Sequence, residues 1–165
     1  MHRPWRIEPG PGQESVWDYP RPPRLERTER RVRVVHAGVT VADTTSAWRV
    51  LETSQAPAYY LPPTDVLTEV VRPTEGRSFC EWKGVAGYWD VVVDDVVAAQ
   101  AAWSYPSPNP AFEPITDHLA SYPQRVDGCF VDDEQVDPND GDFYGGWVTS
   151  HVVGPFKGAP GTLGW

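Results

Sequence analysis

The chain has 165 residues, among them 8 Trp, 7 Tyr and 5 Phe, and a formal net charge of −9. This excludes a disordered segment and fits one domain with a sizeable core. The absence of a run of about 18 apolar residues excludes a membrane-spanning helix, and so acidic a chain repels phosphate backbones and is unsuited to general nucleic-acid binding. The N-terminus lacks the apolar stretch of a signal peptide and the chain has 2 Cys, so we expect a cytoplasmic protein with reduced thiols.

Residues 1–30 are predicted to form an extended N-terminal arm, because six prolines in this stretch forbid a long helix. Residues 1–35 carry 8 Arg against 5 acidic residues, whereas residues 36–165 have a net charge of −12. The arginine-rich segment therefore has two interpretations, an anion-binding patch or a segment that docks on acidic groups of its own chain or of a partner subunit. The second is favoured, because prolines interrupt the segment and no lysine accompanies the arginines.

Alternating apolar and polar residues predict three antiparallel hairpins, each around a two-residue turn. They are residues 31–36 and 39–43 around Ala37-Gly38, residues 88–93 and 96–105 around Asp94-Asp95, and residues 126–131 and 134–136 around Asp132-Asp133. The first turn would pair Val34 with Val41, and the second would pair Tyr88 with Ala101. Both faces of the second hairpin are mostly apolar, so we expect it to be central or covered on both sides.

The remaining elements complete a mainly β prediction. Residues 47–52 fit a short helix or a strand, residues 58–61, 66–71 and 77–82 fit strands, residues 112–122 fit one helix of about three turns, and residues 137–165 fit an aromatic-rich C-terminal wrap packed on the domain. We therefore expect a β domain over residues 31–136, built from small antiparallel sheets and hairpins with one short helix, between long irregular N- and C-terminal arms.

No metal site and no cofactor is predicted. The four histidines, His2, His36, His118 and His151, show no zinc-ligand spacing. The two Asp-Asp pairs are interpreted as turn residues, and residues 137–142 lack the closing Glu of a calcium loop. The chain also lacks a glycine-rich phosphate loop before a helix and a G-x-S-x-G motif.

The candidate site is an aromatic cluster near a cysteine. Tyr88, Trp103 and Tyr105 share one face of the second hairpin, and Cys80 and Trp82 share one face of the preceding strand. Such rings either fill the core or form the wall of a ligand pocket. Cys80 is either a small buried apolar residue or a reactive thiol, whose thiolate form the nearby Lys83 would favour.

Several segments together also indicate a family. They are Arg31-Val-Arg-Val-Val35, Ala42-Asp43-Thr44, Tyr59-Tyr60-Leu61-Pro62, Cys80-Glu-Trp-Lys-Gly84, Ala101-Ala-Trp-Ser-Tyr-Pro106, Phe143-Tyr-Gly-Gly-Trp147 and Gly154-Pro-Phe-Lys-Gly158. This combination, over roughly residues 20–165, resembles the DUF427 family of uncharacterised, mostly bacterial proteins. The resemblance implies a β-tent-like fold, similar in topology to Mss4 and methionine sulfoxide reductase B, and no known reaction. Family members commonly have Pro after the cysteine, whereas Glu81 stands here and opposes thiolate formation.

The leading functional hypothesis is a metal-free domain that binds a small molecule in an aromatic pocket. The predicted ligand-binding residues are Tyr60, Trp82, Lys83, Tyr88, Trp103 and Tyr105, and the rings with one ammonium group suit a planar or anionic ligand. One alternative is an enzyme, either thiol-dependent through Cys80 or nucleotide-processing. A second alternative is a protein-interaction module whose arm and tail meet another subunit, as in a homodimer.

Overall fold

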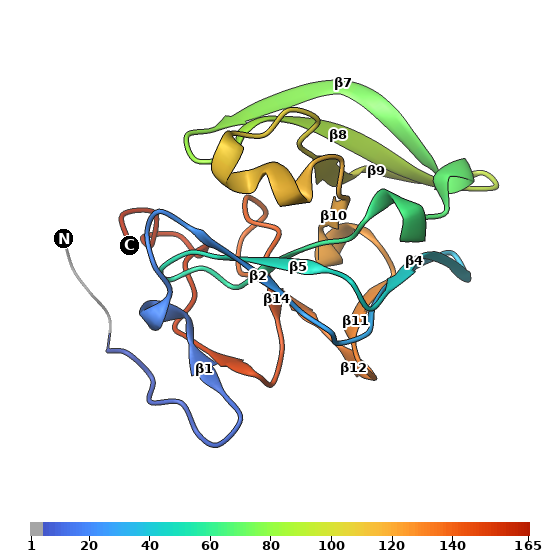
Figure 1. Ribbon diagram of the computed structural model, residues 1–165. Helices are drawn as coiled ribbons and strands as arrows, with labels where there is room; N and C mark the ends of the chain where they lie inside the picture. The colour runs from blue at the N-terminus through green and yellow to red at the C-terminus, as the bar shows by residue number, and fades with distance from the viewer. Residues whose placement is uncertain (1–4) are drawn as a thin grey trace.

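The protein is mainly β, as expected, and consists of small antiparallel sheets with short 3-10 helices (Figure 1). This computed structural model describes residues 5–165, and His2 of the predicted arm lies outside them. The strands are β1 (Glu14–Ser15), β2 (Arg24–Arg27), β3 (Val32–His36), β4 (Val39–Thr44), β5 (Trp48–Leu51), β6 (Ala58–Tyr60), β7 (Val71–Cys80), β8 (Gly84–Val93), β9 (Val96–Ser104), β10 (Ala120–Ser121), β11 (Gly128–Val131), β12 (Glu134–Gln135), β13 (Asp137–Pro138), β14 (Trp147–Val148) and β15 (Val152–Val153). The 3-10 helices are η1 (Val16–Asp18), η2 (Pro63–Asp65), η3 (Thr68–Val70), η4 (Pro110–Ile115) and η5 (Pro123–Arg125).

Three sheets form the body of the fold. Their strand orders are β10-β9-β8-β7, β12-β11-β3-β4 and β2-β5-β6. The first of these contains the longest strands, and Figure 1 shows β7, β8 and β9 as an upper layer above β2, β5 and β14. No helix in the described part of the chain is long and apolar enough to cross a membrane.

The three predicted hairpin turns are confirmed. His36 pairs with Val39 and Val93 pairs with Val96, so each of these turns contains two residues. Ala37, Asp94 and Asp132 have φ values of 48°, 51° and 52°, which is the left-handed conformation that tight hairpin turns need at their first central position. Aspartate tolerates this conformation better than most residues, and this supports the interpretation of the Asp-Asp pairs as turn residues.

The predicted registers of the first two hairpins are wrong, because both ladders are irregular. In the first, a bulge between Val34 and Val35 pairs Val34 with Ala42 instead of Val41. In the second, an irregularity between Trp89 and Val91 pairs Tyr88 with Trp103 instead of Ala101. A bulge inserts residues into one strand and shifts every pair beyond it. The two rings of Tyr88 and Trp103 are therefore direct cross-strand neighbours.

The predicted helix over residues 112–122 is also wrong. The segment begins with η4 (Pro110–Ile115), which contains Pro114, and continues to the short strand β10. Proline has no N–H to donate and its ring clashes with the preceding turn of an α-helix. The buried side chains of Phe112 and Ile115 instead pack on the aromatic cluster through this shorter element.

Two ambiguities between the first and second hairpins are settled. Residues 48–51 form strand β5, which pairs with both β2 and β6. The two separate strands predicted over residues 66–71 and 77–82 are wrong: Thr68–Val70 form η3, and one strand, β7, runs over Val71–Cys80 with a bulge between Pro73 and Arg77. The side chain of Arg77 donates hydrogen bonds to the Thr74 and Gly76 carbonyls of this bulge at 2.9 and 2.7 Å, so these carbonyl groups are covered at the edge of the sheet.

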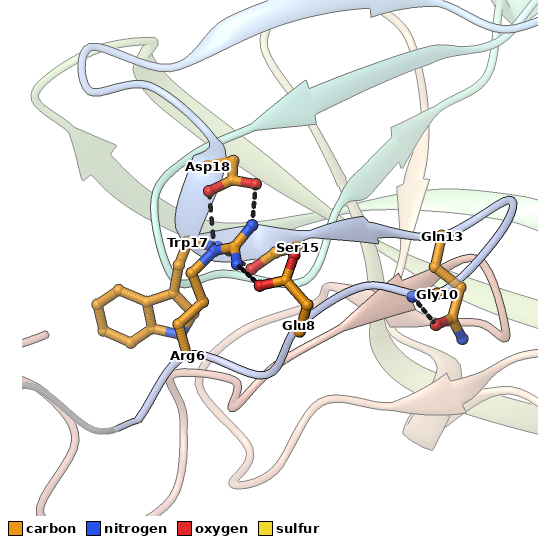
Figure 2. A network of polar contacts seen from close by, with 7 residues as sticks. All are labelled: Arg6, Glu8, Gly10, Gln13, Ser15, Trp17 and Asp18. Atoms are coloured by element: carbon orange, nitrogen blue, oxygen red, sulfur yellow. Dashed lines mark hydrogen bonds and ion pairs between the residues drawn. The ribbon is translucent and has the colours of Figure 1, made fainter.

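The N-terminal arm and the C-terminal tail contact each other. Strand β1 pairs in parallel with β15, and the Trp17 indole donates a hydrogen bond of 2.8 Å to the Pro155 carbonyl. Within the arm, Arg6 binds Asp18 through two hydrogen bonds of 3.0 and 2.6 Å and Glu8 through one of 2.8 Å (Figure 2). Trp147 of the tail is fully buried and stacks on Tyr59 at 4.8 Å, so the tail contributes to the core.

The arginine-rich segment docks on acidic groups of its own chain, as predicted. Arg30 forms an ion pair with Asp132 at 2.7 Å and Arg31 forms one with Asp43 at 2.7 Å. Arg21 lies 3.2 Å from Glu52. These contacts join the segment to three separate parts of the acidic body.

Candidate functional site

A groove of about 570 Å³ opens between the β7–β10 sheet and strands β5 and β6. Its volume lies in the range typical of small-molecule sites. All seven candidate residues chosen from the sequence line this one groove: Tyr60, Cys80, Trp82, Lys83, Tyr88, Trp103 and Tyr105. The fold therefore brings together side chains from four strands and one turn that are widely separated in the sequence.

The floor of the groove is a row of four aromatic rings. Tyr105 lies 6.3 Å from Tyr60, Tyr60 lies 6.1 Å from Trp103, and Trp103 lies 4.6 Å from Tyr122, measured between ring centroids. The Trp103 indole also donates a hydrogen bond of 3.1 Å to the Tyr60 hydroxyl. Each of the four side chains is buried, so these rings are part of the hydrophobic core as well as of the groove floor.

Hydroxyl groups give the groove polar contacts along this floor. Burial raises the pKa of Tyr60, Tyr105 and Tyr122, so these hydroxyls stay protonated near neutral pH and can act as hydrogen-bond donors. The Tyr88 hydroxyl lies 2.8 Å from the Ser78 hydroxyl. Each protonated hydroxyl can both donate and accept a hydrogen bond.

Lys83 reaches the groove from the turn between β7 and β8. Its ammonium lies 5.7 Å from the centroid of the Tyr105 ring, within cation–π range. The turn is fixed by Asn109, whose side chain donates to the Trp82 carbonyl at 2.7 Å and whose N–H donates to the Lys83 carbonyl at 3.0 Å. Gly84 follows with φ +105°, a conformation that other residues rarely adopt.

The C-terminal tail forms a further wall that was not predicted from the sequence. Phe143, Tyr144 and Lys157 of the tail line it, and Arg125 of η5 lies beside them. The only sequence signal for this wall was the spacing of aromatic residues along the tail. Gly145 lies so close to Trp103 that a Cβ added to it would be 2.3 Å from the indole ring. A glycine is therefore required for the tail to approach the groove floor.

Cys80 ends strand β7 as a free, half-buried thiol on the groove wall. No histidine is among the groove-lining residues in the described part of the chain, so the usual base for activating a thiol is not at hand. The second thiol, Cys129, is free and buried, and burial raises its pKa. Among residues 5–165, no three His, Cys, Asp or Glu side chains gather in an arrangement suited to a metal ion.

A domain family of unknown function, DUF427, matches residues 24–132, well over half of the chain. The chain belongs to the DUF427 family. No curated protein gives a significant match. The matched region contains all seven candidate residues, whereas the tail wall with Tyr144 and Lys157 lies beyond it. The DUF427 part therefore supplies the aromatic floor, and the tail completes the groove.

Proposed function

We propose that this DUF427 protein binds a planar, anionic small molecule in the aromatic groove without a metal ion. The observation that carries the proposal is that all seven candidate residues line one groove and that Lys83 stands over a tyrosine ring there. Flat apolar rings stack on the floor, tyrosine hydroxyls donate hydrogen bonds, and an ammonium group attracts an acidic substituent. Each of these contacts favours the same kind of ligand.

The alternatives have weaker support from the same geometry. A thiol enzyme would use Cys80, but Glu81 is adjacent to it and the groove-lining set of the described residues has no histidine. An interaction module would use exposed apolar side chains, and Phe79 and Phe143, 75% and 76% exposed, do lie at the groove. These two rings stand apart from the buried floor, and we assign them to the rim of the ligand site. A β-tent-like topology and a cytoplasmic location, with two free thiols, are part of this proposal.

The test is a thermal-shift screen of planar carboxylates and phosphates, followed by calorimetric titration of each hit. A ligand at 100 times its dissociation constant should stabilise the protein by about 2.7 kcal/mol. Lys83→Ala should weaken binding by about a factor of ten, which is the typical effect of losing one charged contact, and should change the free energy of unfolding by less than about 0.5 kcal/mol.

Cys80→Ser and Arg72→Ala are the matched controls. Serine keeps the size of the cysteine side chain but not its thiol chemistry, and Arg72 is an exposed cation of β7 that does not line the groove. Both variants should bind with unchanged affinity. If Lys83→Ala binds a hit as tightly as the unaltered protein, the site is wrongly placed. If Cys80→Ser abolishes turnover of a hit, the protein is a thiol enzyme.

A further inference from the structure

The lysines of this chain are concentrated at the groove. The sequence contains 14 Lys and Arg residues together, of which only Lys83 and Lys157 are lysines. They come from distant parts of the chain, and both line the same groove. The arginines, in contrast, are spread over the arm, the sheets and η5, and Arg125 is the one that lines the groove in the described part of the chain. The two ammonium groups therefore form a local feature of the groove.

Neither ammonium group is neutralised by the protein. Lys83 lies over Tyr105 and Lys157 lies 5.5 Å from the centroid of Tyr144. Within the described residues no carboxylate lies within 4.0 Å of either ammonium group, although both lysines are half-buried. A partly desolvated cation without a counter-ion is unfavourable, so a bound anion would be stabilised at either position.

Most of the other charged groups that line the groove have a partner of opposite charge. Arg125 lies 3.2 Å from Asp142 and donates to the Gln100 carbonyl at 2.8 Å. Glu52 is paired with Arg21. Glu81 is exposed beside the turn of Lys83. The cations left without a carboxylate partner at the groove are thus the two lysines.

The two lysines approach the groove from different walls, and their backbones are fixed. Lys83 lies in the turn between β7 and β8. Lys157 lies in the tail, where its N–H donates to the Ser54 carbonyl at 2.8 Å and its carbonyl accepts from the buried Asn139 side chain at 2.5 Å. In Figure 1 the C-terminus and the β7–β8 turn both lie toward the left of the molecule. Both lysines line the same groove, so a ligand that fills the groove would contact both walls.

From these observations, and resting on the binding function proposed above, we infer that the ligand is a planar molecule with two negative charges that contacts both Lys83 and Lys157. The two charges can belong to one phosphate group between the lysines or to two separate carboxylates. Both sources have the same chemistry, a flat ring for the aromatic floor and an oxyanion charge for each ammonium group.

Four probes with the same two-ring skeleton separate these features: naphthamide, naphthoate, naphthyl phosphate, and a naphthalene dicarboxylate with its acid groups on opposite rings. Naphthamide is neutral and naphthoate carries one negative charge. Naphthyl phosphate carries two charges on one group, because a phosphate monoester is doubly charged above its second pKa of about 6. The dicarboxylate carries one charge on each of two groups. Titration calorimetry should show at least one doubly charged probe binding about tenfold more tightly than naphthoate. The tighter of the two doubly charged probes identifies the source of the charge.

Lys83→Ala and Lys157→Ala should each weaken binding of that probe by about tenfold, with naphthamide binding unchanged. Arg72→Ala, which removes a positive charge outside the groove, should leave all four affinities unchanged. If Lys83→Ala weakens binding but Lys157→Ala does not, or if naphthoate binds as tightly as both doubly charged probes, the inference is wrong and the proposed function stands. If none of the four probes binds at millimolar concentration, both are wrong.

Discussion

The N-terminal region and the aromatic groove use most of their positive charges differently. In the N-terminal region most guanidinium groups contact carboxylates, as Arg6 does with Asp18 at 2.6 Å and Arg31 does with Asp43 at 2.7 Å. Arg27 and Arg33 are exceptions and lie over the rings of Trp48 and Phe130. In the groove the ammonium groups of Lys83 and Lys157 lie over tyrosine rings. The planar fork of arginine matches a carboxylate in two places, whereas lysine is a flexible point charge. The paired arginines therefore stabilise the fold, whereas Lys83 and Lys157 remain available for a ligand.

A second cavity, of about 280 Å³, differs from the groove in the same way, because its cations are paired with carboxylates. It is lined by polar residues, with Arg49, Arg30 and His151 among them. Arg49 is hydrogen-bonded to Glu14 at 2.5 Å and also to Glu26. Burial alone would raise the pKa of Glu14, but the hydrogen bonds from Arg49 and Tyr19 outweigh it, and the pKa is lowered. The central cation of this cavity is therefore already neutralised by the protein, unlike the lysines of the groove.

The largest expected effect comes from Arg49→Met, which removes the charge and keeps much of the side-chain volume. The variant should lose about 2 kcal/mol of unfolding free energy, measured by urea denaturation. Breaking a fully buried ion pair costs about 3–5 kcal/mol, and the effect here is smaller because Glu14 and Glu26 are 41% and 39% exposed. A stability equal to that of an Arg72→Ala control would contradict the structural role assigned to arginine.

A somewhat smaller effect is expected at the wall that the tail adds to the groove. Gly145→Ala places a Cβ 2.3 Å from the Trp103 ring, so the tail or the indole must move, and we expect a loss of about 1 kcal/mol. Gly164→Ala is the matched control, because a Cβ there meets no atom within 4 Å. If both variants unfold at the same urea concentration, the tail does not pack on the groove floor.

The smallest effect is a dependence of stability on acid pH that comes from the exposed ion pairs. Hydrogen bonds from Arg6, Arg31 and Arg30 lower the pKa of Asp18, Asp43 and Asp132, respectively. A carboxylate whose pKa is lowered by folding stabilises the native state above its unfolded pKa of about 3.9, and this contribution is lost as the pH falls through the folded value.

Unfolding free energies measured from pH 7 down to pH 3 should therefore decrease below about pH 5. Asp18→Asn should flatten this decrease by a small amount, and Arg6→Ala by at least as much, because Arg6 also bonds Glu8. The double variant should flatten it no further than Arg6→Ala alone, because Asp18 acts through Arg6. A steeper decrease in either single variant would show that the pair does not stabilise the fold.

The sequence predicted the turns well, because turns depend on local chemistry, and it grouped residues that line one groove. Ala37-Gly38 and Asp94-Asp95 tolerate the positive φ that tight turns need. Alternation then places Tyr88 and Trp103 on one face, and the observed register keeps them there because it differs from the predicted one by two residues. The helix predicted over residues 112–122 is opposed by Pro114, and the structure has a short 3-10 helix over Pro110–Ile115 there.

The registers and the far wall of the groove were decided only by tertiary structure. A bulge depends on packing against neighbouring strands, so the pairing of Tyr88 with Trp103 could not be derived from period-two alternation. Gly145 lies against Trp103, which is far from it in the sequence. A local sequence pattern therefore cannot predict this contact. The sequence by itself determined the mainly β class and the shared face of Tyr88, Trp103 and Tyr105, because side-chain alternation and turn chemistry act over a few residues. Only the folded chain brought Lys157 to the groove of Lys83, because that contact depends on how the tail packs across the sheets.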